Sequence, residues 1–166
     1  DSIAHYDSYY LQGVISVFMI LFGINFSAYY LVLSRRLRDA LRIEEIRLYL
    51  GIILGFTLLI TFNVRDMFGS FFESFHHALF QVASIITTTG FATVDFNYWP
   101  AFSKSLLVLL MFIGACAGST GGGIKCSRIV LMLKSIKKEM QYLIHPRAVG
   151  VNKMDGHRVQ HEVMRS

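Results

Sequence analysis

Charged residues are scarce in this chain. Asp, Glu, Lys and Arg make up 16% of its 166 residues, against about 25% in soluble domains. Hydrophobic residues make up 54%, and the mean hydropathy is +0.48. There are only two prolines and no polar low-complexity run, so the sequence offers no flexible linker between soluble domains. We therefore predict an all-α membrane protein.

Residues suited to catalysis or metal binding are also few. Cys116 and Cys126 show no metal-ligand spacing, and we expect both to be free and buried. His76 and His77 are adjacent on a predicted helix and so point apart, which argues against a shared metal. Glu73 is expected at the start of that helix, where its charge suits the dipole. No Ser, Cys or carboxylate constellation indicates catalysis, so we predict that the chain is not an enzyme.

The apolar residues lie in three blocks, residues 14–33, 48–62 and 102–117. The first block matches the roughly 20 apolar residues that a membrane-spanning helix needs. Two basic clusters follow the first and third blocks: Arg35, Arg36, Arg38, Arg42 and Arg47, then Lys125, Arg128, Lys134, Lys137, Lys138 and Arg147. By the positive-inside rule both clusters face the cytoplasm.

This sidedness constrains the stretch between the second and third blocks. If both basic clusters are cytoplasmic, the second apolar block must cross the membrane outward and the third must cross it inward. The residues between these two blocks then begin and end on the outer side. Residues 70–86 then cannot form a full span, and we predict a re-entrant half-helix. Phe96, Tyr98 and Trp99 would mark the outer interface before Pro100 starts the next helix.

Three threonines and a glycine follow this half-helix in the run SIITTTGF, residues 84–91. Ion-selective filters are built from rings of backbone carbonyls, with glycine where the chain needs a positive φ. The C-terminal end of the half-helix carries a partial negative charge, which favours a cation. Residues 87–91 therefore suit the return limb of a pore loop. The alternative is a β-prone polar loop beside a helix.

A second unusual run is GACAGSTGGGIK, residues 114–125. An unbroken helix from Pro100 to about Met140 would be about 60 Å long, twice the hydrocarbon thickness. Three successive glycines cost about 1 kcal/mol each in a helix. We predict two helices joined by a flexible loop near the membrane centre, as in transport proteins. Close helix packing is an alternative; a nucleotide-binding P-loop fits poorly, because Ile124 separates the glycines from Lys125.

These motifs together resemble the Trk/Ktr/HKT superfamily of potassium transporters, in particular its TrkH branch. The resemblance is carried by ALFQVAS at residues 78–84 leading into TTTGF, by WP at residues 99–100 and by FIGACAGSTGGGIK at residues 112–125. The segment HPRAV at residues 145–149 is similar to the same branch. The chain begins without Met or a basic signal region, so we interpret it as an excerpt of a longer polypeptide.

The resemblance implies four repeats of helix, pore loop and helix around one central pore. Residues 1–47 would be the last helix of the preceding repeat, at about residues 12–34, with a cytoplasmic connection. Residues 48–144 would be a complete third repeat, and residues 145–166 a cytoplasmic segment leading to a missing repeat. The parts of the third repeat would be a helix at 48–64, a pore helix at 70–86, a filter at 87–91 and a broken helix at 100–143 with its loop at 118–124.

The resemblance also implies roles for individual residues. The potassium filter would be Thr87, Thr88, Thr89 and Gly90, with Phe91 packing behind. The gate would be formed by Gly118, Ser119, Thr120, Gly121, Gly122, Gly123 and Lys125.

The partners implied are potassium as the transported ion, a second copy in a homodimer and a cytosolic ring of nucleotide-binding regulatory subunits. The implied location is the bacterial inner membrane, and no cofactor is implied. The alternative is a non-conducting membrane anchor or assembly subunit, in which TTTGF is a loop and GSTGGG packs helices.

Overall fold

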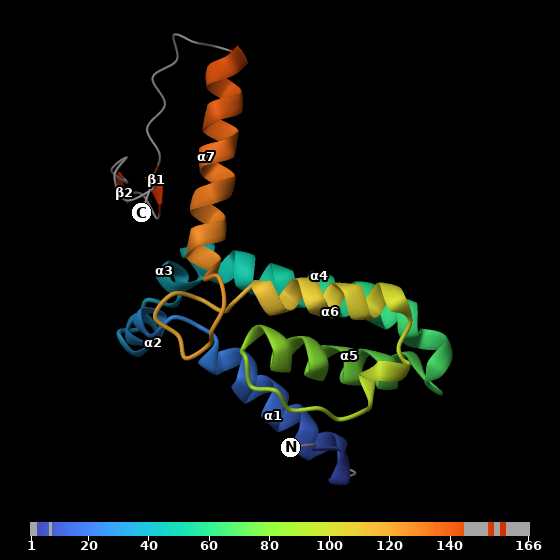
Figure 1. Cartoon of the computed structure of the whole chain (residues 1–166). Helices are drawn as coiled ribbons and strands as arrows, with labels where there is room; N and C mark the ends of the chain where they lie inside the picture. The colour runs from blue at the N-terminus through green and yellow to red at the C-terminus, as the bar shows by residue number, and fades with distance from the viewer. Residues whose placement is uncertain (1–2, 7, 145–152, 155–156, 159–166) are drawn as a thin grey trace.

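The computed structural model describes residues 3–6, 8–144, 153–154 and 157–158, and these are mainly helical (Figure 1). The helices are α1 (Tyr9–Phe22), α2 (Phe26–Leu33), α3 (Leu37–Arg42), α4 (Glu44–Val64), α5 (Phe71–Ile86), α6 (Ala101–Phe112) and α7 (Cys126–Ile144). Short 3₁₀ turns occupy Ile3–His5, Arg65–Met67 and Phe96–Tyr98. Two short strands, β1 (Lys153–Met154) and β2 (His157–Arg158), pair antiparallel. The predicted helical class is confirmed for the described residues.

The predicted cytoplasmic segment at residues 145–166 lies outside the described residues, apart from β1 and β2. The HPRAV motif at residues 145–149 and the basic residue Arg147 are therefore not part of the described structure.

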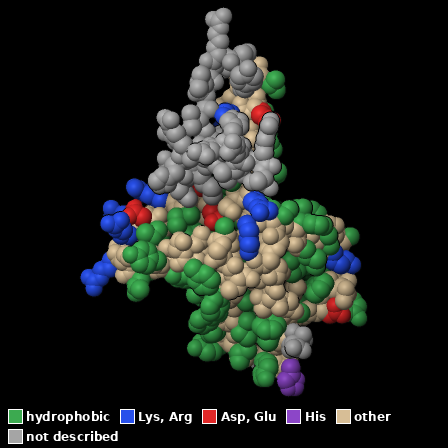
Figure 2. Space-filling model, turned by 60° about the vertical axis from the view of Figure 1, so that its left-hand side comes forward, with side chains coloured by type: hydrophobic (Ala, Val, Ile, Leu, Met, Phe, Trp, Pro, Cys, Tyr) green, Lys and Arg blue, Asp and Glu red, His purple; other side chains and the backbone are tan. Residues whose placement is uncertain are grey.

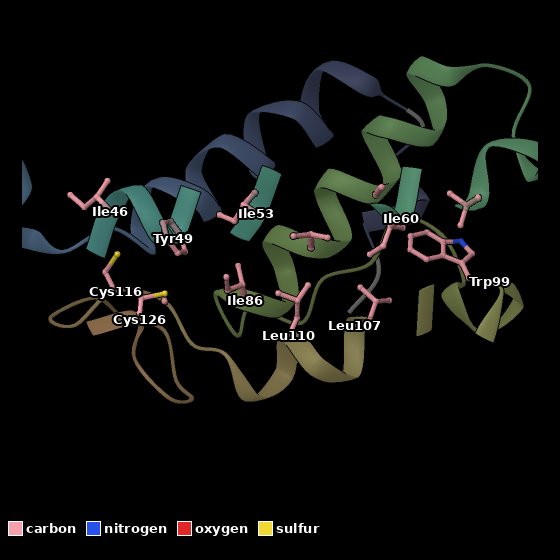
Figure 3. Packing of buried hydrophobic residues seen from close by; sticks show 14 of the residues in the cluster. Ile46, Tyr49, Ile53, Ile60, Ile86, Trp99, Leu107, Leu110, Cys116 and Cys126 are labelled. Carbon is pink, nitrogen blue, oxygen red and sulfur yellow. The ribbon is translucent and has the colours of Figure 1, made fainter. Parts of the chain in front are cut away.

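The central helix is α4, which packs against α5, α6 and α7. Its buried hydrophobic side chains recur every three or four residues or at multiples of that spacing: Ile46, Tyr49, Ile53, Ile60 and Val64. Figure 3 shows Ile53 and Ile60 of this stripe facing Ile86 of α5 and Leu110 of α6, and Ile46 and Tyr49 beside the two cysteines. Because nearly all of α4 is apolar, its composition does not distinguish one face from another. The buried stripe identifies the face that is directed into the core.

One continuous helix in the described part of the chain, Glu44–Met67, is long and apolar enough to cross a membrane. It includes α4 and the 3₁₀ turn that follows, and α4 begins earlier than the predicted helix at residues 48–64. The apolar helix α6 is shorter than a span. Large hydrophobic side chains stay exposed on α1, α4 and α6, among them Phe18, Phe62 and Phe112 (Figure 2). Lipid or further protein is expected to cover such a surface.

The structure differs from the prediction of one helix over residues 12–34. That segment forms α1 and α2, which are bent by 97° at the break between them. At the break, a Cβ on Gly23 would lie 2.1 Å from the hydroxyl oxygen of Tyr49. The same hydroxyl donates a hydrogen bond to the Ile20 carbonyl at 3.1 Å. The Asn25 side chain then caps the first turn of α2.

Helix α5 packs against both α1 and α4. It begins after Ser70, whose hydroxyl oxygen accepts a hydrogen bond from the Glu73 N–H at 3.1 Å. This N-cap places Glu73 in the first turn, where the sequence predicted it. The helix ends at Ile86, immediately before the three threonines.

The prediction for the aromatic residues before α6 is only partly right. Tyr98 is 79% exposed, as an interfacial residue would be. Trp99 is only 3% exposed and belongs to the same core cluster as Val64 and Leu107. Its large apolar ring fills the core where the chain turns into α6, so it does not mark an outer interface.

The break at Gly23 leads to a stability prediction. Replacing Gly23 with Ala should lower the unfolding temperature of the full-length protein, because the new methyl would overlap the Tyr49 hydroxyl. Overpacking of this kind costs about 1–3 kcal/mol. Gly51→Ala in α4 is the control, since a Cβ there meets no atom within 4 Å. Thermal unfolding in detergent should separate the two variants, and equal unfolding temperatures would refute this account of the break.

Candidate functional site

The hydroxyl-rich turn after α5 has an unusual backbone. Thr87, the C-cap, has φ −89° and ψ 0°. Thr88 and Gly90 have φ +57° and +81°. A left-handed conformation is rare for a β-branched residue such as threonine and costs about 1–2 kcal/mol. Backbone strain of this kind is concentrated at functional sites.

Hydrogen bonds to the last turn of α5, and within the turn itself, hold this turn in place. The Ser84 carbonyl accepts from the Thr89 N–H at 2.9 Å, and the Ser84 hydroxyl donates to the Phe91 carbonyl at 2.6 Å. The Thr87 hydroxyl donates to the Ala83 carbonyl at 2.7 Å and lies 2.8 Å from the Thr89 hydroxyl. The turn is therefore tied to the last turn of α5.

Three carbonyl groups of the turn remain available to another partner. Among the described residues, no group donates a hydrogen bond to the carbonyl oxygen of Thr88, Thr89 or Gly90, and all three residues are exposed. The Thr87 carbonyl, in contrast, accepts from the Thr88 hydroxyl at 2.7 Å. The free carbonyls follow the C-terminal end of α5, whose partial charge is negative. This arrangement suits a cation and not an anion.

The side chain of Phe91 is partly buried and packs against a small cluster formed by Met19 of α1 and Phe80 and Ala83 of α5. Between α1 and the turn is a groove of about 380 Å³. Apolar side chains of α1 line one side of it, and Thr89 and Thr120 are among the polar residues that line it.

The glycine-rich segment between α6 and α7, residues 113–125, forms a compact loop. The sequence predicted a shorter loop, at residues 118–124. At the base of the loop, Ile113 and Ile124 form an isolated parallel bridge, and the Gly114 N–H donates to the Ile124 carbonyl at 2.8 Å. A Cβ on Gly114 would lie 2.0 Å from the carbonyl oxygen of Gly122. Glycine is therefore required there because two backbone segments approach closely.

Within the loop, Gly118 and Gly123 have φ +68° and +76°, values that favour glycine. The Ser119 hydroxyl donates to the Cys116 carbonyl. Lys125 donates from Nζ to the carbonyl of Gly121, so its charge is directed back onto the loop. These contacts make the loop a defined structure.

The two segments that the sequence singled out touch each other. The Gly122 N–H donates to the Thr88 hydroxyl oxygen at 3.0 Å. A Cβ on Gly121 would lie 3.5 Å from the Thr87 carbonyl oxygen. The Thr120 hydroxyl is 3.5 Å from the Phe22 carbonyl oxygen at the end of α1. The loop thus lies directly against the turn.

Glu45 also belongs to this site, although the sequence analysis did not identify it. Its side chain is buried, and its Oε1 accepts from the N–H groups of Ala117 at 2.6 Å and Ser127 at 2.9 Å. Ser127 lies in the first turn of α7, where a negative charge is favourable. In the sequence, Glu45 stands at the start of an apolar helix, and nothing local connects it to the loop.

The cysteines agree with the sequence analysis, but the histidines do not point apart as predicted: the ring centroids of His76 and His77 are 5.6 Å apart in an edge-on contact. Cys116 and Cys126 are free and buried, and Figure 3 shows both beside Tyr49 in the core. His76 and His77 bond to different neighbours, Gln12 and Thr93 respectively. The described residues contain no group of three His, Cys, Asp or Glu side chains that could hold a metal ion.

Comparison with known proteins identifies relatives along the whole chain. The family model described as "TrkH: Cation transport protein" matches residues 1–166. The Trk system potassium uptake protein TrkH of Salmonella typhimurium is 36% identical over 151 residues, covering 89% of this chain and 31% of the relative. TrkG of Escherichia coli is 37% identical over 172 residues, covering 100% of this chain and 35% of the relative.

A solved structure is similar as well. The crystal structure of the potassium transporter TrkH from Vibrio parahaemolyticus matches with a TM-score of 0.90 and 33% identity, over 98% of this chain and 36% of that chain. The chain thus spans about a third of the length of its relatives. Membership in a transporter family agrees with the apolar surface and with a location in a membrane. The chain belongs to the TrkH family of cation transport proteins, which are transporters and not enzymes.

Proposed function

We propose that the full-length protein containing this chain takes up potassium ions across the bacterial inner membrane. The ions would pass a selectivity filter formed in part by residues 87–91 and gated by the glycine-rich loop. The names of the relatives support potassium as the transported ion, since both are called potassium uptake proteins. The observation that carries the proposal is the set of carbonyls at Thr88, Thr89 and Gly90, which receive no hydrogen bond from the described residues.

In the filter, these carbonyl oxygens would replace part of the hydration shell of potassium. The change in the sign of φ from Thr87 to Thr88, with a positive value again at Gly90, supports this role. Such changes turn successive carbonyls toward a common side. Irregular backbone at membrane depth is tolerated where it is buried in protein or lines a watery cavity. One repeat supplies only part of a filter, and the remaining carbonyls would come from the rest of the protein.

In the gate, the loop would block the ion path while it lies against the turn and open the path when it moves away. The contact between the Gly122 N–H and the Thr88 hydroxyl supports this arrangement. The proposed gate residues are Gly118, Ser119, Thr120, Gly121, Gly122, Gly123 and Lys125. Apart from Lys125 their side chains are small or absent, and glycine permits more backbone conformations than other residues, which would let the loop move.

The topology and assembly form part of the same proposal. Residues 44–67 would cross the membrane, and α5 would be a re-entrant half-helix that enters from the outer side. The protein would be a homodimer that binds a cytosolic ring of nucleotide-binding subunits. Exposed basic side chains on α7, such as Arg128 and Lys137, suit an acidic partner surface or anionic lipid headgroups on the cytoplasmic side.

The filter is tested by replacing Gly90 with Ser in the full-length protein. A serine at φ +81° is strained and should tilt the filter peptides, which lowers selectivity for potassium over sodium. The measurement is ion uptake in a potassium-starved bacterial strain lacking its own uptake systems. The intact protein should rescue growth, and the variant should lose rescue or leak sodium.

The control for this experiment is Gly69→Ser, in the exposed segment before α5. A Cβ at Gly69 makes one ordinary contact, 3.6 Å from Glu73 Oε2, so selectivity should stay unchanged. Unaltered selectivity in Gly90→Ser, at equal amounts in the membrane, would refute the filter assignment. Failure of the inserted wild-type protein to rescue growth would favour the non-conducting anchor.

The gate is tested by deleting residues 121–123. The deletion removes the hydrogen bond to Thr88, and potassium flux into liposomes should rise in the absence of any regulatory subunit. Gly55→Ala in α4, outside the loop, is the control, because a Cβ there meets no atom within 4 Å. Its basal flux should stay close to that of the wild type. Unchanged flux in the deletion would mean that the loop only packs helices.

Access from water distinguishes a pore from an anchor. Cysteines introduced at Thr88 and Ser119 should react with small water-soluble thiol reagents if the turn and loop line an ion path. Ala78→Cys is the control, since Ala78 is fully buried and should stay unreactive in either case. Protection of all three positions in the membrane would contradict the pore.

A further inference from the structure

Glu45 is a buried carboxylate in the first turn of α4, with 3% of its surface exposed. Its neighbour Glu44 differs, because it forms an ion pair with Lys134 of α7 at a partly exposed position. Burial of a carboxylate is unfavourable unless strong hydrogen bonds compensate for the lost water. The hydrogen-bond partners of Glu45 therefore indicate the structural role of its carboxylate.

Both of its identified partners are backbone N–H groups on either side of the glycine-rich part of the loop, residues 118–123. Oε1 accepts from Ala117 at 2.6 Å and from Ser127 at 2.9 Å. Ala117 precedes the glycine-rich part of the loop, and Ser127 follows it in the first turn of α7. A single carboxylate oxygen of α4 thus binds both the loop, at Ala117, and the first turn of α7, at Ser127.

The middle of the loop is held differently. It contacts the turn through the bond from the Gly122 N–H to the neutral hydroxyl of Thr88. Charge-assisted hydrogen bonds are roughly twice as strong as neutral ones. Of these two attachments, the one to Glu45, on either side of residues 118–123, is therefore the stronger.

We propose that Glu45 is a positioning residue for ion transport: its charge holds the glycine loop against the turn that contains Thr88. This inference rests on the function proposed above, in which the loop is the gate. Since the same oxygen binds the loop at Ala117 and the first turn of α7 at Ser127, a displacement of α7 away from α4 breaks the bond to Ser127 and weakens the hold on the loop. Figure 1 shows α7 projecting from the helical body, so a force on this helix acts directly on Glu45. The loop would then be released from its closed position.

The test uses the full-length protein in liposomes, with any cysteine outside this chain replaced by serine. Cys116 and Cys126 flank the glycines and are buried, so their reaction with a water-soluble maleimide reports displacement of the loop. The variants are Glu45→Gln, which keeps the shape and an acceptor oxygen but removes the charge, and Glu45→Ala. Glu73→Gln, which removes a carboxylate from the first turn of α5, is the matched control. Potassium flux without a regulatory subunit is measured on the same samples.

We expect Glu45→Gln to raise the labelling rate roughly tenfold, and Glu45→Ala to raise it further, as bonds to a charged acceptor are weakened and then lost. Flux should rise with labelling, and the control should match the wild type. Unchanged labelling in Glu45→Gln would refute the role of Glu45, and this variant decides the matter if Glu45→Ala does not fold.

The two readouts separate this inference from the gate itself. Faster labelling with unchanged flux would support the positioning role and contradict the gate function of the loop. If deletion of residues 121–123 raises flux while both Glu45 variants keep wild-type labelling, the gate stands and the role of Glu45 is refuted.

Discussion

Residues 113–125 belong to no helix, so their backbone N–H groups need hydrogen-bond acceptors from elsewhere. The arrangement of the described helices depends on where these acceptors come from. An unpaired N–H in an apolar environment costs several kcal/mol. Besides carbonyls of α6 and of the loop itself, the acceptors come from three separate elements: the Glu45 carboxylate on α4, the Gly23 carbonyl at the end of α1 and the Thr88 hydroxyl after α5. Satisfying one irregular loop therefore ties these elements together.

Other irregularities of the fold follow from the same requirement. Because the chain breaks after α1, the Gly23 carbonyl is free to accept from the Cys116 N–H at 3.0 Å. The unfavourable φ of Thr88 persists in a residue whose hydroxyl both donates to the Thr87 carbonyl and accepts from Gly122. Strain and buried charge thus occur where the loop is held, which is the pattern expected of a functional site.

Much of the helical layout was predictable, because long apolar runs and helix caps are local signals. Ser70 and Glu73 mark the start of α5, and the three glycines at 121–123 mark the interruption between α6 and α7. The bend at Gly23 was missed because a single glycine in a uniformly apolar run is compatible with a helix. It breaks the helix only because Tyr49, distant in sequence, occupies the adjacent space. Trp99 was misplaced for a similar reason, since burial depends on neighbours from other helices.

The sequence by itself determined the apolar helices and the positions of the two irregular segments, since both are set by the composition of short consecutive runs. Tertiary structure alone decided which face of α4 is buried, that Gly122 meets Thr88, and that Glu45 binds backbone on either side of residues 118–123. These contacts join residues far apart along the chain. No local pattern encodes them, because the same side chains would satisfy local rules equally well with other partners.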